Sequence, residues 1–285
     1  MSAVNNPWNG ISWSQTVAQC DIVFFNNKYG SPGKYVKEIN DRYPNARLSI
    51  DDCLPEPFSG DIDSKVYCLN MNPGVRVTDF CQQSDTSLVY QDQIKDVLCK
   101  HKNHLFDNLM FDGTVIYSSE KDFNSFFGSK EKLNEYKRQN KVGNVTITPR
   151  PHAGAIWQRE LLLNPLKKLL GRDPNLFIIE FFPYHSAGGF DFPKDLPSYQ
   201  YRNQLIENAM RDHKLIIIMR QEKQWYGIED NGLGQKIQTY PNKILLRGSQ
   251  RPWISPGNFC RDVNLFVNPI PDWAYKTLDE VLYFF

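Results

Sequence analysis

Four short apolar runs, separated by segments with helical spacing, constrain the fold of this chain more than any other feature. Each run is rich in branched aliphatic or aromatic residues and carries few charges. Strands that are buried on both faces have this composition, because helices cover both sides of a parallel sheet. The sequence therefore predicts an α/β fold: a three-layer α/β/α arrangement around a central, mainly parallel four-stranded sheet. The predicted strands are residues 66–71, 175–189 with a break at Pro183, 215–219 and 243–247.

The segments between these runs give the rest of the predicted organisation. Ser31, just before Pro32, is typical of a helix start, and Gly171 is typical of a helix end. Two prolines and a glycine in residues 54–64 predict a loop, and the charged segment 118–144 predicts a surface excursion. We expect residues 1–53 to form a helical extension packed on the core, and residues 54–285 to form the α/β/α domain. The predicted helices are residues 12–28, 32–43, 154–171, 198–214 and 272–285.

Charge and cysteine usage argue against several classes of protein. The formal net charge is +1 and the pI about 7.6, so no overall field attracts nucleic acid or a membrane surface. Nucleic-acid binding would need a local basic face. The six cysteines form no CxxC pair, which argues against a zinc ribbon, an iron–sulfur cluster or a compact disulfide scaffold. We expect no metal and no cofactor.

The sequence also predicts where the protein works. Its first residues lack the basic and apolar regions of a signal peptide, and no apolar segment reaches membrane-spanning length. We therefore expect a reduced, cytoplasmic protein that does not enter membranes. Aromatic residues make up 13% of the chain. They serve either as core filler or as stacking platforms for bases or sugars.

Polar and glycine-rich segments follow the predicted strands. The ligand crevice of an open α/β sheet lies outside the carboxyl ends of its strands, so these segments are the candidate site. The four segments read NPGV, FFPYHS, RQEKQW and GSQRPWISPGN. Three of them are rich in amide, hydroxyl, proline, glycine or aromatic groups.

The first segment contains Asn72, Pro73 and Gly74. Proline forces a bend and removes a backbone donor, and glycine permits a close approach by a ligand. The amide of Asn72 can hold and orient a water molecule, although it cannot act as a strong base. The plainer interpretation is a strand-to-helix turn with Asn72 as its cap.

The second and last segments carry aromatic and charged groups. Glu180, Phe182, Tyr184 and His185 could grip a planar heterocycle by stacking and by edge hydrogen bonds. Alternatively, the phenylalanines are core residues and His185 caps a helix. The loop 249–261 combines a cation, an indole and small polar groups, which suits insertion beside a nucleic-acid backbone. Its plainer interpretation is a proline-stiffened surface loop.

The order of these segments resembles the uracil-DNA glycosylase superfamily. The first motif of its mismatch-specific branch resembles LNMNPGV, residues 69–75. The segment LFIIEFFPYHS takes the place of the middle strand, and KILLRGSQRPWISPGNF falls where the second motif does. The resemblance covers about residues 54–262. It departs from the family in several ways: motif one has no Asp, motif two has no His, and the four cysteines of the iron–sulfur branches are absent. The middle strand of many members ends in an Asn that reads the base, whereas this chain has Glu180 or an aromatic residue there.

The resemblance implies roles for individual residues. Asn72 would position the attacking water, the backbone near Gly74 would help to bind the base, and Ser255 would hold the phosphates. The implied catalytic residues are Asn72 and Ser255. The implied substrate-binding residues are Asn70, Met71, Pro73, Gly74, Phe80, Glu180, Phe182, Tyr184 and His185. The implied DNA-binding residues are Arg251, Trp253, Pro256, Gly257 and Asn258.

We therefore expect a monomeric DNA glycosylase-like protein that flips a modified or mispaired base, of the uracil type, and hydrolyses its N-glycosidic bond. Extrusion of the base costs a few kcal/mol, and least for mispaired or damaged bases. A second hypothesis is a catalytically silent module of the same fold that binds nucleic acid or a nucleotide. A third is a small-molecule enzyme that binds phosphate at the turn after Gly74.

Overall fold

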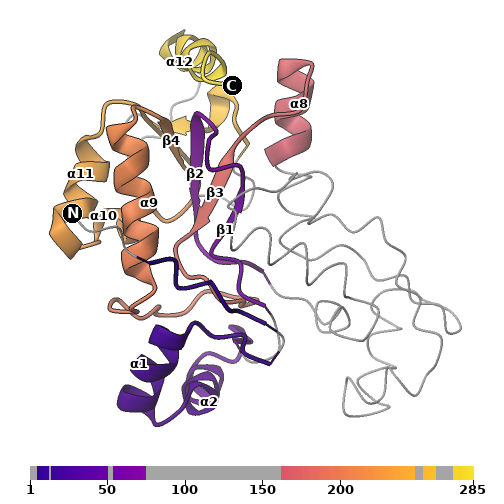
Figure 1. Cartoon of the computed structure of the whole chain (residues 1–285). Helices are drawn as coiled ribbons and strands as arrows, with labels where there is room; N and C mark the ends of the chain where they lie inside the picture. The colour runs from indigo at the N-terminus through magenta and orange to yellow at the C-terminus, as the bar shows by residue number, and fades with distance from the viewer. Residues whose placement is uncertain (1–4, 13, 51–53, 75–161, 248–252, 261–271) are drawn as a thin grey trace, which may run out of the picture.

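The computed structural model of the 285-residue chain describes residues 5–12, 14–50, 54–74, 162–247, 253–260 and 272–285 (Figure 1). These residues form a mixed α/β fold around one six-stranded sheet, with the strand order β1-β3-β2-β4-β5-β6. The predicted α/β class is therefore confirmed. The strands are β1 (Phe58–Gly60), β2 (Val66–Asn70), β3 (Phe177–Glu180), β4 (Leu215–Ile218), β5 (Lys243–Leu246) and β6 (Phe259–Cys260).

The four predicted strands are the parallel centre of this sheet. β2 pairs in parallel with β3 and β4, and β4 pairs in parallel with β5. The expected total of four is wrong, because β1 pairs antiparallel with β3 and β6 pairs antiparallel with β5. The predicted loop 54–64 is likewise wrong at Phe58–Gly60. Strands of two or three residues among prolines and glycines give no alternating pattern, so the sequence does not reveal them.

Several helices follow the sequence signals, but the predicted helix at residues 12–28 begins only at Gln19, because Ser12 and Gln15 pair in an isolated β-bridge before it. The Ser31 hydroxyl accepts a hydrogen bond from the amide of Lys34 at 3.1 Å, which confirms the predicted N-cap. Gly171 ends its helix with φ of 68°, a left-handed conformation that suits glycine. Residues 118–144 and 154–161 lie outside the described residues. The helices are α1 (Gln19–Tyr29), α2 (Pro32–Arg42), α8 (Asn164–Leu170), α9 (Tyr199–Arg211), α10 (Glu222–Tyr226), α11 (Leu233–Thr239) and α12 (Asp272–Leu282), with short 3-10 turns η4 (Asp230–Gly232) and η5 (Pro256–Asn258).

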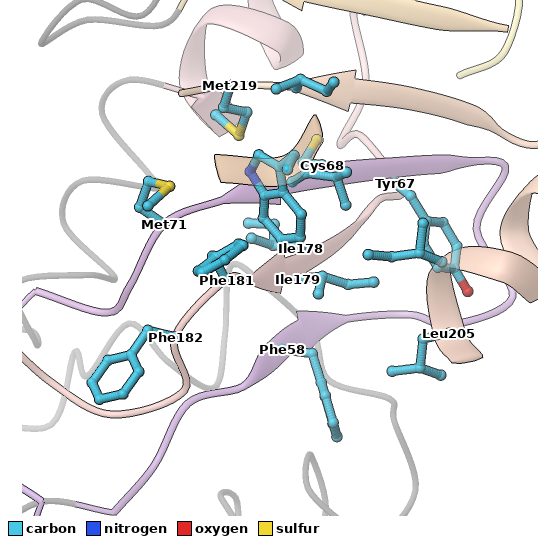
Figure 2. Packing of buried hydrophobic residues seen from close by; sticks show 14 of the residues in the cluster. Phe58, Tyr67, Cys68, Met71, Ile178, Ile179, Phe181, Phe182, Leu205 and Met219 are labelled. Atoms are coloured by element: carbon cyan, nitrogen blue, oxygen red, sulfur yellow. The ribbon is translucent and has the colours of Figure 1, made fainter. Parts of the chain in front are cut away.

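Helix α9 covers one face of the sheet, and α8 lies beyond β3 on the other side (Figure 1). Phe58 of β1 packs on Tyr201 of α9, with ring centroids 6.3 Å apart. Figure 2 shows Phe58, Tyr67 and Leu205 together on this side of the strands. Figure 2 also shows Met71, Phe181 and Met219 around the ends of β2, β3 and β4, where the parallel strands stop.

The N-terminal segment packs against the chain that leaves β3. The amide of Ser49 donates to the carbonyl of His185 at 2.9 Å, and the amide of Ala187 donates to the carbonyl of Ala46 at 2.6 Å. Helices α1 and α2 lie next to each other at this end of the molecule (Figure 1). The domain boundary predicted at residue 53 falls between the described ranges, and it stays a prediction.

A substitution at Gly188 would test how tightly the N-terminal segment packs against the chain that leaves β3. A Cβ atom at Gly188 would lie 2.6 Å from the carbonyl oxygen of Asn45, which is backbone and cannot move aside cheaply. We expect Gly188→Ala to lower the free energy of unfolding by about 1–3 kcal/mol. The control is Gly189→Ala, because a Cβ there meets nothing within 4 Å. Urea denaturation of both variants checks the prediction, and equal stability of the two would contradict it.

Candidate functional site

The ends of β2 and β3 lie at the point where the strand order of the sheet reverses. The chain passes from β2 to β3 on one side, and then to β4 on the other side of β2. Ligands of open α/β sheets bind at such switch points, outside the carboxyl ends of the strands. The residues that follow β2 and β3, which the sequence analysis chose as the candidate site, therefore lie at such a switch point.

Asn72 is clamped by the chain that leaves β3. Its Nδ2 donates to Ser186 Oγ at 2.8 Å, to the Ser186 carbonyl at 3.1 Å and to the Pro73 carbonyl at 3.0 Å. Because carbonyl oxygens only accept hydrogen bonds, these contacts fix which end of the amide is nitrogen. Oδ1 is thereby turned away from the clamp as an acceptor on a half-buried residue. This geometry suits an atom that holds a water molecule.

Ser186 is part of this clamp, and the sequence analysis did not single it out. Its hydroxyl donates to the carbonyl of Gly188 at 2.9 Å, so its oxygen is oriented to accept from Asn72. The signal was its position in FFPYHS, directly after His185. Its pairing with Asn72 depends on the strand register, which is not readable from either segment alone.

Asn70 and Glu180 form a buried polar pair one residue before these loops. They face each other in the β2–β3 register, and Asn70 Nδ2 donates to Glu180 Oε1 at 3.0 Å. The exposed fractions are 6% for Asn70 and 5% for Glu180. Within the described ranges, neither Asn70 Oδ1 nor Glu180 Oε2 has a hydrogen-bond partner. Buried polar atoms are almost always paired, so these two mark an unusual place.

Burial determines the protonation of Glu180. Desolvation raises the pKa of this carboxyl to about 8, against the opposing effects of the Asn70 hydrogen bond and the Arg220 charge. Glu180 therefore carries a proton at neutral pH and can donate a hydrogen bond. Arg220, just beyond β4, was not among the predicted site residues. Burial lowers its pKa and the charge of Glu180 opposes that shift.

His185 ties the two loops to the N-terminal half of the chain. Its Nδ1 lies 2.9 Å from the Gly74 carbonyl, and its Nε2 lies 2.8 Å from the Leu54 carbonyl. A neutral imidazole has one N–H and can donate to one of these oxygens, whereas an imidazolium can donate to both. The side chain is 1% exposed. These contacts position the Gly74 loop, and they leave the substrate-binding role of His185 a prediction.

The protein core holds three of the predicted substrate-binding residues, Met71, Phe182 and Tyr184. The Tyr184 hydroxyl donates to Asp21 Oδ2 at 2.7 Å and accepts from the amide of Ala18 at 3.2 Å. Phe182 stacks on Phe192 with centroids 5.0 Å apart. Met71 is 8% exposed. Their substrate-binding roles stay predictions, and the packing supports the plainer interpretation as core residues.

The last predicted segment lies at the end of β5, which β4 separates from β2. At the usual strand spacing β5 lies about 10 Å from β2 across the sheet. Asn258 Nδ2 donates to the Trp253 carbonyl at 2.9 Å and closes the loop, while the Trp253 side chain is 40% exposed. Ser255, Pro256 and Gly257 are half-buried. The loop thus exposes an indole, and the DNA-binding role of its residues stays a prediction. Phe80 and Arg251 lie outside the described residues.

Arg202 of α9 supports the end of β3. It is 7% exposed, its Nη1 donates to the Phe181 carbonyl at 2.6 Å, and its Nη2 donates to Asn203 Oδ1 at 2.8 Å. The guanidinium lies 3.9 Å from the centroid of Tyr199. Burial lowers the pKa of Arg202 to about 10, so it remains a cation at neutral pH. This buried cation holds the backbone next to Glu180.

In the part of the chain that the structure describes, no helix is both long and apolar enough to cross a membrane. The same residues contain no group of three or more His, Cys, Asp or Glu side chains that could hold a metal ion. Comparison of the chain with protein-family models, with curated proteins and with solved structures finds no match.

Proposed function

We propose that the loops at the ends of β2 and β3 bind a nucleobase, and that the protein is a DNA glycosylase-like hydrolase. It would act on a modified or mispaired base flipped from duplex DNA. The observation that carries the proposal is the clamp on Asn72, which fixes its nitrogen and leaves Oδ1 as an oriented acceptor. The resemblance of residues 69–75 to the first motif of the uracil-DNA glycosylase superfamily supports it.

The reaction needs an oriented water more than a strong nucleophile. The water oxygen forms a bond to C1′ of the sugar while the bond from C1′ to the ring nitrogen breaks. The electron pair of that bond stays on the ring, and the water loses one proton to solvent. Asn72 Oδ1 would accept a hydrogen bond from the water and aim its lone pair at C1′. It takes no proton, because an amide does not titrate in this range. Correct placement alone contributes substantially to such a rate.

Base release from short duplexes tests this proposal. The substrates carry uracil, hypoxanthine, xanthine or a thymine opposite guanine. We expect release from at least one of them, and a loss of about 10²-fold or more in Asn72→Ala, by analogy with the removal of other single positioning amides. The control is Asn242→Ala, because Asn242 donates to the His213 carbonyl just before β5 begins, at the amino-terminal end of the parallel strands and opposite the site. Unchanged release by Asn72→Ala would exclude the water-positioning role.

The silent binding module remains the second candidate, and one observation favours it. Glu180 is the one carboxyl group in residues 70–74 and 180–188, and burial keeps it protonated at neutral pH. These described loops therefore hold no ionised carboxylate to take a proton from water. Salt-sensitive DNA binding without base release would select this candidate, since salt dependence reports released counterions.

The proposal also covers the partner, the oligomeric state and the location of the protein. DNA or a nucleotide is the proposed partner, and the protein is proposed to act as a monomer. The cytoplasmic location is supported by the free thiols of Cys20, Cys68 and Cys260. The phosphate site expected at the turn after Gly74 falls on residues outside the described ranges, so the small-molecule enzyme remains untested.

A further inference from the structure

The chain that leaves β3 is bonded to two other parts of the protein. We call residues 184–188 the β3 exit segment. It holds the loop after β2 through Ser186, whose hydroxyl accepts from Asn72 at 2.8 Å, and through His185, whose Nδ1 lies 2.9 Å from the Gly74 carbonyl. The orientation of the loop after β2 therefore depends on where the β3 exit segment lies.

The β3 exit segment is held in turn by residues 46–49, which we call the N-terminal contact segment. The carbonyl of Ala46 accepts from the amide of Ala187 at 2.6 Å, and the amide of Ser49 donates to the carbonyl of His185 at 2.9 Å. The exposed fractions are 0% for Ala46 and 5% for Ser49. Burial keeps water from replacing such hydrogen bonds, so the two segments are held in one arrangement.

Helix α2 fixes the N-terminal contact segment through one side chain. Asn40 Nδ2 donates to the Leu48 carbonyl at 3.0 Å, and Asn40 Oδ1 accepts from the Leu48 amide at 2.6 Å. Next to Leu48, Arg47 has φ of 43°. A residue other than glycine rarely adopts this left-handed conformation, and it persists where surrounding contacts hold the backbone. The paired hydrogen bonds of Asn40 supply such contacts.

We propose that Asn40 is a positioning residue for Asn72: it fixes residues 46–49, which hold the β3 exit segment and thereby orient the Asn72 amide. This inference rests on the proposed function for its effect on base release, but the orientation of Asn72 can be measured without any reaction. It gives the N-terminal residues a part in the candidate site, whereas the sequence predicted a helical extension packed on the core.

The loss of Asn40 should loosen only part of these contacts. Without its side chain, the amide and carbonyl of Leu48 lose their partner inside the protein, although this residue is 3% exposed. The N-terminal contact segment should then open locally more often. The start of the β3 exit segment has its own anchor, because the Tyr184 hydroxyl donates to Asp21. We therefore expect an effect at residues 185–188 and at Asn72 rather than general unfolding.

Hydrogen exchange of the Asn72 side-chain amide, followed by NMR in the full-length protein, tests the inference. Its resonances are identified by their absence in Asn72→Asp. We expect Asn40→Ala to speed this exchange about tenfold, since the loss of two hydrogen bonds favours local opening by about that factor. The amide of Asn203, which donates to Asp230 Oδ2 at 3.0 Å and is 5% exposed, reports opening elsewhere and should keep its wild-type rate.

Two further variants are matched to Asn40→Ala. Asn27→Ala removes an exposed asparagine from α1 and should leave the Asn72 exchange rate unchanged. Asn40→Asp keeps an acceptor for the Leu48 amide and loses the donor to its carbonyl, so its effect should be smaller than that of Asn40→Ala. It also carries the test if Asn40→Ala does not fold. An unchanged Asn72 rate in the Asn40 variants would overturn the inference, and so would an equal increase at Asn72 and Asn203.

Base release separates this inference from the proposed function. If the protein releases a base, Asn40→Ala should lower kcat about tenfold with little change in KM, because a misplaced water slows the chemical step. Faster Asn72 exchange with unchanged base release would overturn the positioning role of Asn40. Faster Asn72 exchange in a protein that releases no base from any duplex would support the positioning of Asn72 and overturn the glycosylase.

Discussion

Replacing Glu180 by Gln is expected to stabilise the protein at alkaline pH by on the order of 4 kcal/mol and to have little effect near pH 4. The reason is the cost of keeping this carboxyl buried. Its folded-state pKa is raised from 4.5 to about 8. The protonated form is therefore favoured by folding, and its stabilising contribution is complete below about pH 4.5. That contribution is lost as the pH rises from 4.5 to about 8, and glutamine has no such loss.

Urea denaturation of the wild type and Glu180→Gln at several values between pH 4 and pH 9 measures this effect. The difference between the two proteins should grow with pH and then level off above about pH 8, while other titrating groups cancel in the difference. Glu229→Gln, which changes an exposed carboxyl, should give a difference that does not vary with pH in this way. A constant difference for Glu180→Gln would mean that Glu180 is ionised in the folded protein.

Replacing Arg202 by Lys is expected to lower the free energy of unfolding by about 3 kcal/mol, although the substitution keeps the positive charge. The planar guanidinium reaches the Phe181 carbonyl and Asn203 Oδ1 at once, and it also lies over the ring of Tyr199. A lysine ammonium cannot form this fork, and it would leave buried acceptors and a buried cation poorly paired.

Thermal and urea denaturation of Arg202→Lys check this value. The matched control is Arg211→Lys on the same helix, whose side chain is largely exposed and pairs with Asp212. Surface changes of this kind stay within about 0.5 kcal/mol. A loss below about 1 kcal/mol in Arg202→Lys would show that its charge alone, without its shape, supports the end of β3.

The sequence predicted the elements whose signals are local. The apolar runs around Leu69, Ile179 and Ile217 became the central parallel strands, and Ser31 caps its helix as expected. These features depend on periodicity and on a few neighbouring residues. The two edge strands were missed because strands of three and two residues are too short to show an alternating pattern of apolar and polar residues.

The sequence predicted that the candidate residues lie at strand ends, but it did not predict their contacts. Asn72 and Glu180 lie at strand ends, and this follows from the polar residues after each apolar run. The partners of these residues come from register, which brings residue 70 to residue 180 and residue 72 to residue 186. Tyr184 shows the same limit: the sequence suggested that it contacts a ligand, but its hydroxyl donates a hydrogen bond to Asp21, 163 positions earlier.

The bond between Tyr184 and Asp21 also has a consequence during synthesis. These residues are separated by 163 positions, so the ribosome needs roughly ten to thirty seconds to make the second after the first. During that interval helix α1 can form its local contact between Phe25 and Tyr35, but its buried aspartate has no native donor from Tyr184 or Ser198. The segment that carries α1 therefore completes its packing only after Tyr184 and Ser198 have been made.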